Sequence, residues 1–159
     1  MKKFRVPVNE PYLFGNEKKY LQKCIKDGFI SSSGPFVKKF EEKFAKRLKR
    51  KFAISVSNGT AALQLAFESL NIKKNDEVIL PSFTIISCIL PVIRCGATPI
   101  LIDSDPITWN MDVMKIEDVI TSKTKVIIAP HIYGLPIDMD PLLKIAKKHK
   151  LKVIEDAAE

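Results

Sequence analysis

Short apolar runs alternate with longer amphipathic stretches from about residue 52 to Glu159. The runs are rich in Val, Ile and Leu and end at turn-forming residues, which predicts buried strands. These strands are expected over residues 52–56, 77–80, 99–102, 125–129 and 152–155. The stretches between them predict helices over residues 60–70, 84–94, 112–120 and 141–149. The alternation indicates an α/β fold, with a mainly parallel sheet and flanking helices.

The first third of the chain lacks such runs. Residues 1–14 contain two prolines and predict an irregular segment. A helix is expected from Asn16, as its N-cap, to Asp27. A second amphipathic helix should follow Pro35, because apolar residues recur there every four positions and define a core face. They are Phe36, Phe40, Phe44 and Leu48.

The composition is that of a globular protein. The chain has 159 residues, of which 46% are hydrophobic and 28% charged, so it can build one core. No stretch approaches the roughly 20 apolar residues of a membrane helix, and no apolar run follows the charged N-terminus as in a secretory signal. Three cysteines without metal spacing indicate a reduced protein, so we expect a cytoplasmic location and no metal site.

The formal charge of +8 is concentrated in residues 38–51. This run could bind nucleic acid, but it coincides with the second amphipathic helix, where a charged face is ordinarily solvated. We therefore expect no nucleic-acid partner. A positive field could still steer a phosphorylated small molecule toward the protein.

Candidate chemistry gathers where the predicted strands end. Asp156 follows an apolar run, and ligands of open α/β sheets bind at the carboxyl ends of strands. Gly59, Thr60 and Ala61 open a helix, whose free N–H groups can bind phosphate. Asp156 could instead be an ordinary solvated carboxylate, and residues 59–61 could be an ordinary helix N-terminus. The dinucleotide-binding glycine pattern is absent.

Two further residues lie at the same predicted edge. Phe83 could flank an aromatic ring, although it could equally pack into the core. His131 follows another strand, although a lone histidine is more often structural. Together, the four strand ends suit a phosphorylated, cationic, aromatic cofactor. Pyridoxal 5′-phosphate has this chemistry, because its phosphate needs N–H donors and its pyridine nitrogen needs an acidic partner.

The same residues carry a family resemblance. The chain resembles the DegT-type nucleotide-sugar aminotransferases, and its opening segment and Glu159 are most similar to the perosamine synthase-type subgroup. The matching motifs stand in the family's order at residues 10–13, 15–17, 28–34, 57–63, 80–84, 96–99, 130–134 and 153–159.

The resemblance implies the aminotransferase type I fold, with pyridoxal phosphate as cofactor. Residues 1–34 would form an N-terminal arm and helix on the substrate side. Residues 35–159 would form an incomplete large domain that binds the cofactor. The implied enzyme transfers an amino group from glutamate to a nucleotide-linked keto sugar, for surface polysaccharide synthesis, and acts as a homodimer.

The resemblance also implies roles for particular residues. Asp156 would hold the pyridine nitrogen, and Glu159 would contact the ring hydroxyl, where most relatives have Gln. The phosphate would be held by Gly59, Thr60 and Ala61. The nucleotide-sugar would lie near Ser31, Ser32, Ser33 and Gly34.

Two departures from the family pattern matter. Ile85 stands where many relatives have an aromatic residue that stacks on the cofactor, so either an apolar contact suffices or Phe83 or His131 substitutes. The family's Schiff-base lysine lies beyond Glu159, so we expect the 159-residue chain alone to be inactive. A histidine at that position would make the enzyme a sugar dehydratase, and a non-catalytic truncated product is a further alternative.

Overall fold

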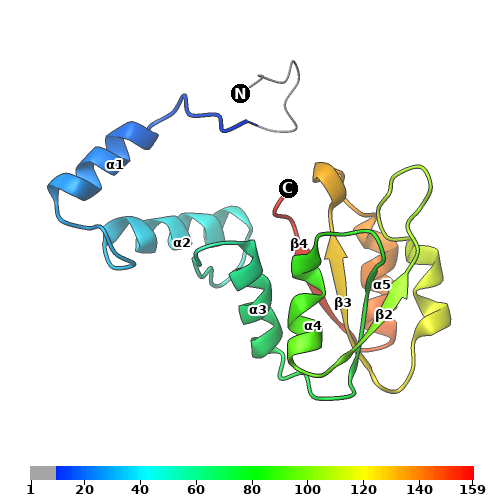
Figure 1. Cartoon of the computed structure of the whole chain (residues 1–159). Helices are drawn as coiled ribbons and strands as arrows, with labels where there is room; N and C mark the ends of the chain where they lie inside the picture. Colours follow the sequence, from blue (N-terminus) through cyan, green and yellow to red (C-terminus); the bar gives the residue numbers. More distant parts are fainter. Residues whose placement is uncertain (1–9) are drawn as a thin grey trace, which may run out of the picture. The chain divides into compact units, whose positions relative to one another are not determined.

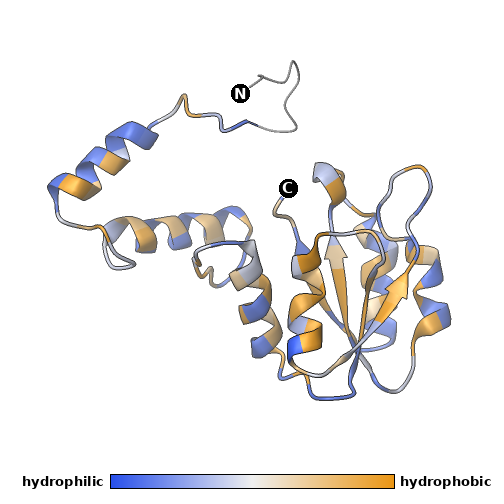
Figure 2. Ribbon diagram, viewed as in Figure 1, coloured by the Kyte–Doolittle hydropathy of each residue, from blue (hydrophilic) through white to orange (hydrophobic). Residues whose placement is uncertain are grey.

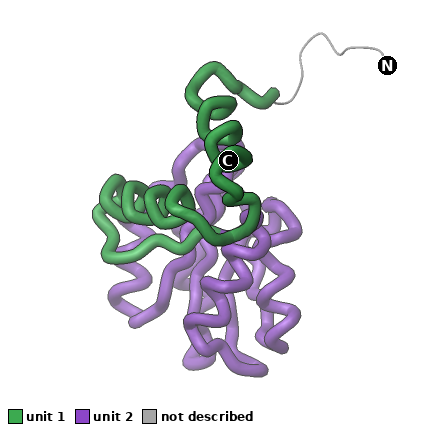
Figure 3. The backbone as a smooth tube through the Cα atoms, turned by 90° about the vertical axis from the view of Figure 1, so that its left-hand side faces the viewer, with its two compact units in different colours: residues 1–55 green, residues 56–159 purple. Residues whose placement is uncertain are grey.

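The computed structural model describes residues 10–159 (Figure 1). The chain divides into two compact units, residues 1–55 and 56–159 (Figure 3). Of the irregular segment predicted over residues 1–14, residues 1–9 lie outside the described part. Residues 10–14 form neither helix nor strand, as predicted.

The first unit contains two helices, α1 (Glu17–Lys26) and α2 (Pro35–Arg47). Both were predicted, and Pro35 occupies the first turn of α2, where its missing N–H costs no hydrogen bond. The apolar face of α2 is less buried than predicted, since Phe40 and Phe44 are 55% and 46% exposed. Together with side chains of α1, they line an open apolar hollow.

The second unit is built on a four-stranded parallel sheet in the order β2–β1–β3–β4. The strands are β1 (Glu77–Pro81), β2 (Thr98–Ile102), β3 (Thr124–Pro130) and β4 (Lys152–Asp156). Its α-helices are α3 (Gly59–Ser69), α4 (Leu90–Arg94) and α5 (Met139–Lys148). The four corresponding strand predictions, and the parallel sheet, are confirmed.

Apolar side chains fill both faces of the sheet. Val78, Leu80, Val126 and Ile128 pack against α3 and α4, with Phe67 of α3 only 2% exposed. The alternate strand residues face α5 on the other side, where Leu142 is fully buried. Burial on both faces explains the continuous apolar runs of β1 and β3, and Figure 2 shows the run along β3.

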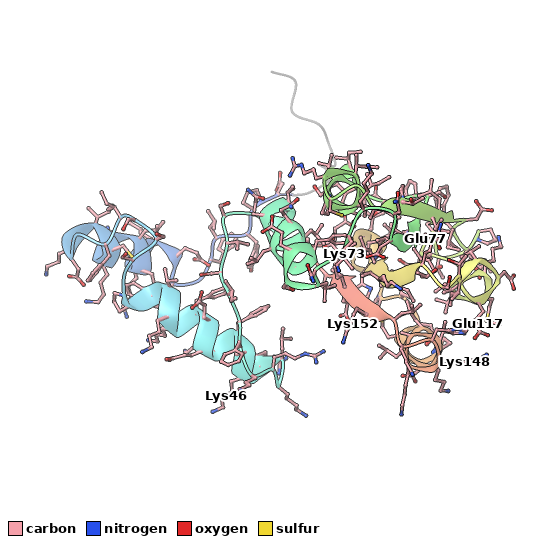
Figure 4. All side chains as sticks on the ribbon, turned by 90° about the horizontal axis from the view of Figure 1, so that it is seen from below. Lys46, Lys73, Glu77, Glu117, Lys148 and Lys152 are labelled. Carbon is pink, nitrogen blue, oxygen red and sulfur yellow. The ribbon has the colours of Figure 1, made fainter. Side chains whose placement is uncertain are left out.

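Short 3₁₀ turns complete the second unit: η1 (Ile86–Cys88), η2 (Val113–Lys115), η3 (Glu117–Val119) and η4 (Ile132–Gly134). Lys148 of α5 lies 2.8 Å from the Glu117 carboxylate, an ion pair that ties η3 to α5 (Figure 4). Among the described residues, the helices are all too short or too polar to cross a membrane.

The strand predicted over residues 52–56 is wrong. This segment has no regular structure, and Phe52 and Ile54 are 74% and 70% exposed. The backbone N–H and hydroxyl of Ser55 both bond the carboxylate of Glu41 at 2.8 Å, and no strand pairs with the segment. Apolar residues do alternate in this segment, but it pairs with no strand of the sheet.

Two predicted helices are replaced by shorter elements. The helix expected over residues 84–94 is divided into η1 and α4, with Pro91 in the first turn of α4, where a proline without an N–H is tolerated. The helix expected over residues 112–120 is wrong in type, because η2 and η3 are separate 3₁₀ turns. Asp112 caps the first of them through the N–H of Met114.

Candidate functional site

The carboxyl edge of the sheet brings together the ends of β1, β3 and β4 and the start of α3. A small hollow of about 50 Å³ opens there. Its lining residues are Thr84, Ile85, Pro130, His131, Ile132, Asp156, Ala158 and Glu159. Four of the predicted site residues, Ile85, His131, Asp156 and Glu159, therefore share one hollow.

Asp156 is the last residue of β4 and is half-buried. One carboxylate oxygen accepts the N–H of Ala158 at 3.2 Å, and the other accepts the thiol of Cys88 at 3.4 Å. Both bonds are long, and a thiol is a weak donor, so the carboxylate keeps acceptor capacity for a stronger partner. A charged N–H donor is the partner that such a carboxylate favours most.

The Cys88 thiol is the buried hydrogen-bond partner of Asp156. Its side chain is fully buried, and its sulfur accepts the hydroxyl of Thr84 at 3.3 Å. Burial raises the pKa of the Cys88 thiol to about 11. The neighbouring carboxylate adds to this rise in pKa, while the bond from Thr84 opposes it. Cys88 thus stays a neutral thiol that can donate to Asp156.

The N-terminus of α3 offers hydrogen-bond donors at the same edge. The side chain of Asn58 caps the helix by accepting the N–H of Ala61 at 2.9 Å. Within the described residues, the N–H groups of Gly59 and Thr60 have no such partner. A Cβ placed on Gly59 would lie 3.7 Å from the Ala158 side chain, so the helix start lies beside the segment after β4.

The hydroxyl of Thr60 shares a hydrogen bond of 2.8 Å with the hydroxyl of Ser87 in η1. This bond fixes Thr60 at the helix start, where free N–H groups and the helix dipole favour an anion. Neither Ser87 nor the role of Cys88 was predicted from the sequence. The available signal was their position, three and four residues after Thr84.

The ring of His131 has a neighbour at each of its nitrogens. Its Nδ1 accepts the N–H of Ile137 at 3.2 Å, and its Nε2 lies 3.3 Å from Glu155. Strand residues alternate between faces, so Glu155 and Asp156 point to opposite sides. Both ring nitrogens are engaged, which holds His131 in a fixed orientation rather than free to meet a ligand.

Glu159, Phe83 and Ile85 lie near the hollow in different ways. Glu159 accepts the N–H of Tyr133. Ile85 is 58% exposed on the wall of the hollow. The ring of Phe83 instead packs edge-on against Trp109, with centroids 5.4 Å apart, in a neighbouring hollow. The structure therefore brings Ile85, and not Phe83, beside Asp156.

The remaining candidates, Ser31 to Gly34, belong to the first unit. The three serines are exposed, and the N–H of Ser33 bonds the Ser31 hydroxyl at 3.3 Å. Gly34 has a φ of +139° and lies against Phe29, where a side chain would be strained. Their role toward a nucleotide-sugar stays a prediction.

These donors and acceptors fit a phosphorylated pyridine ring. The carboxylate of Asp156 can accept a protonated ring nitrogen, and α3 offers two free N–H groups and a hydroxyl to a phosphate. The hollow forms only one wall of such a site, because pockets for ligands of that size enclose at least about 300 Å³. Within residues 10–159, no three His, Cys, Asp or Glu side chains gather as metal ligands do.

Comparisons with known proteins agree with this chemistry. The model of the DegT/DnrJ/EryC1/StrS aminotransferase family matches residues 12–159. The GDP-perosamine synthase of Caulobacter vibrioides is 48% identical over 155 residues, which cover 98% of this chain and 42% of that protein. The chain thus spans about two fifths of the length of the curated relatives that it matches.

Solved structures give the same fold. An aminotransferase from Psychrobacter cryohalolentis is 36% identical, with a TM-score of 0.85 over 94% of this chain and 38% of that one. A GDP-4-keto-6-deoxy-D-mannose-3-dehydratase of E. coli, solved with bound hydrated pyridoxal phosphate, is 28% identical. Its TM-score is 0.86, over 94% of this chain and 40% of the dehydratase. The predicted family and fold class are confirmed.

Proposed function

The chain belongs to the DegT/DnrJ/EryC1/StrS aminotransferase family, and we propose that it forms the cofactor-binding part of an aminotransferase for nucleotide-linked sugars. The cofactor we propose is pyridoxal 5′-phosphate. The observation that carries the proposal is the common placement of the Asp156 carboxylate and the start of α3 at one edge of the sheet.

Each residue at this edge has a definite task in the proposal. Asp156 would accept a hydrogen bond from the ring nitrogen and keep it protonated. The N–H groups of Gly59 and Thr60, and the Thr60 hydroxyl, would hold the phosphate. Ile85 would offer the ring an apolar contact. When bound, pyridoxal phosphate supplies an electron sink for chemistry at a substrate carbon next to nitrogen.

Two predicted residues take changed roles. The N–H of Ala61 is bonded to Asn58, so Ala61 contributes by its place in the helix rather than as a donor. His131 positions the backbone at the end of β3, because the Nδ1 of its ring holds the N–H of Ile137. Glu159 remains the candidate partner of the cofactor's ring hydroxyl, since it lines the same hollow.

The substrate we propose is a nucleotide-linked keto sugar, with glutamate as the amino donor. The name of the Caulobacter relative supports the sugar, since perosamine is an amino sugar carried there on GDP. The complete protein would act in the cytoplasm as a homodimer, with no membrane or nucleic-acid partner and no metal. Its product would serve surface polysaccharide synthesis.

A second candidate is a sugar dehydratase that uses the same cofactor. The observation in its favour is the likeness of the fold to the E. coli dehydratase. The higher identity to the perosamine synthase favours the aminotransferase. A lysine in the complete protein at the family's Schiff-base position would support amine transfer, and a histidine would support dehydration.

The test supplies the complete protein with a GDP-linked 4-keto-6-deoxy sugar and nitrogen-labelled glutamate. We expect mass analysis to find the label in the sugar nucleotide and 2-oxoglutarate as the second product. A product that has lost water without gaining nitrogen would replace the proposal by the dehydratase. No conversion of any nucleotide-linked keto sugar, by folded protein loaded with the cofactor, would contradict both candidates.

A further inference from the structure

A second and larger hollow, of about 350 Å³, adjoins the candidate cofactor site. Its lining residues are Phe83, Thr108, Trp109, Ile132, Tyr133 and Leu135. Ile132 lines both hollows, and the N–H of Tyr133 bonds the carboxylate of Glu159. The second hollow is therefore a neighbour of the edge that carries Asp156.

Three aromatic rings remain accessible in this hollow. Phe83 is 40% exposed, Trp109 58% and Tyr133 78%. The Phe83 and Trp109 rings meet at an interplanar angle of 61°, so each leaves a face uncovered. Large aromatic side chains are costly to leave in water, and neighbouring exposed rings mark surfaces that bind a partner or ligand.

The loop that carries Trp109 is tightly fixed. One oxygen of Asp105 accepts the N–H groups of Ile107 and Thr108 and the hydroxyl of Thr108, at 2.7 to 3.0 Å. The carbonyl of Asp105 accepts the N–H of Trp109 at 2.9 Å. Trp109 is thus exposed on a rigid support and not on a loose loop.

Asn110 joins this loop to the turn that carries Tyr133. It is 4% exposed, and its amide nitrogen donates to the carbonyl of Leu135 at 2.9 Å. Its amide oxygen accepts the N–H of Ile132 at 3.0 Å. These two bonds set the spacing between Trp109 and Tyr133, which makes Asn110 a positioning residue.

Both aromatic residues also adopt left-handed backbone conformations, with φ of +63° at Trp109 and +50° at Tyr133. The other non-glycine residues of this kind in the described chain are two Asn and two Lys. A bulky residue in this conformation costs about 1–2 kcal/mol, and such strain gathers at functional sites. The fold thus accepts strain to present these two rings.

The chemistry of the walls selects the ligand. The lining residues carry no charge, and their polar side-chain groups are two hydroxyls and the indole N–H. A diphosphate would need cations there, and a sugar with several hydroxyls would need more polar partners. A neutral planar ring with few polar edges needs neither, and it stacks well on aromatic faces.

We propose that this aromatic hollow binds the base of the nucleotide-linked substrate, with Asn110 holding the Trp109 and Tyr133 rings at the required spacing. The proposal rests on the proposed function for the class of substrate. It adds a place for the nucleotide's base, next to the edge where the sugar would react, and it assigns Phe83 to the base rather than to the cofactor.

Trp109 is the only tryptophan of the chain, so its fluorescence reports on this hollow directly. The test titrates the 159-residue protein with GMP, and separately with ribose 5-phosphate, which lacks the base. We expect GMP to quench the Trp109 emission in a saturable manner and ribose 5-phosphate to leave it unchanged. Equal effects of both, or no saturable quenching by GMP, would overturn the proposal without any variant.

Variants sharpen this test. Phe83→Leu and Tyr133→Asn remove a ring, and asparagine tolerates the left-handed conformation at Tyr133. Each should weaken GMP binding by about tenfold, the usual loss for one stacked ring. The matched controls Phe83→Tyr and Tyr133→Phe keep the rings and should bind GMP as the parent does. Ring-removing variants that fold, by circular dichroism, and bind GMP normally would contradict the proposal.

The measurement needs neither the cofactor nor amine transfer. Saturable quenching by GMP without amine transfer would reject the proposed activity and retain the base site. Amine transfer without quenching would reject the base site alone. The two proposals can therefore fail separately.

Discussion

The thiol of Cys88 lies 3.4 Å from the carboxylate of Asp156, although 68 residues separate them in the sequence. One residue belongs to a 3₁₀ turn after β1 and the other ends β4. This contact joins the core on one face of the sheet to the site at its edge. A buried cysteine is ordinarily just an apolar core residue, but Cys88 also donates a hydrogen bond to a carboxylate of the candidate site.

The reactivity of Cys88 follows from this environment. With a pKa of about 11, only about one thiol in a thousand is ionised at pH 8, and the side chain is fully buried. Iodoacetamide should therefore modify the half-buried Cys24 and Cys95 well before Cys88. Peptide mass mapping of the folded protein checks this order, and early modification of Cys88 would show that the turn is open.

The stability of the second unit should fall in alkaline solution. The pKa of Cys88 rises from an ordinary 9.0 to about 11 on folding, so the folded state binds the proton more tightly. The contribution of this pKa shift to the free energy of unfolding is complete below pH 9. It should decrease by about 2–3 kcal/mol as the pH rises to 11. Urea unfolding of the parent and of Cys88→Ala, measured from pH 9 to pH 11, checks this prediction, because the variant lacks the titrating thiol. An equal decline in both proteins would assign the effect to other groups.

Asn110→Ala should destabilise the second unit by about 2–4 kcal/mol. The change leaves the buried N–H of Ile132 and the partly buried carbonyl of Leu135 without their partner. Asn110→Asp is the matched control, because it can still accept from Ile132 but cannot donate to Leu135. A cost for Asn110→Ala below about 0.5 kcal/mol in urea unfolding would show that the two segments do not depend on this clamp.

Two adjacent leucines of α5 test the core. Leu142 is fully buried against the sheet, whereas Leu143 is 49% exposed. Leu142→Ala should cost about 2–5 kcal/mol, because it removes buried surface and leaves a cavity. Leu143→Ala should cost less than about 1 kcal/mol, since that side chain is partly in water already. Similar losses of thermal stability in both variants would mean that α5 packs differently.

Much of the second unit could be predicted from the sequence. The runs ending at Pro81 and Pro130 are buried on both sides, and such runs stand out without knowledge of the fold. The shorter run ending at Asp156 belongs to an edge strand in which only Ile154 is buried. The edge to which they lead follows from parallel pairing alone, so Asp156 could be placed there. The start of α3 was assigned to the same edge through a strand over residues 52–56 that does not form, although α3 does lie beside the end of β4. The family resemblance then supplied the cofactor that this edge would hold.

Other features depend on contacts between distant residues. Residues 52–56 alternate like a strand, but the bonds from Ser55 to Glu41 decide their conformation. The clamp at Asn110 and the left-handed Trp109 and Tyr133 have no periodic pattern that a sequence would show. His131 could be placed at the correct edge, yet the orientation of its ring depends on contacts with Glu155 and Ile137.

In the proposed nucleotide-sugar aminotransferase, the carboxylate of Asp156 holds the ring nitrogen of the cofactor. The most direct measurement is the rate of amine transfer by the complete protein carrying Asp156→Asn, loaded with pyridoxal phosphate. A neutral amide cannot stabilise the charge on the ring nitrogen, so the rate should fall at least about a hundredfold. Glu155→Gln, on the opposite face of β4, should stay close to the parent. A near-parent rate for folded Asp156→Asn would show that this carboxylate is not needed at the ring nitrogen.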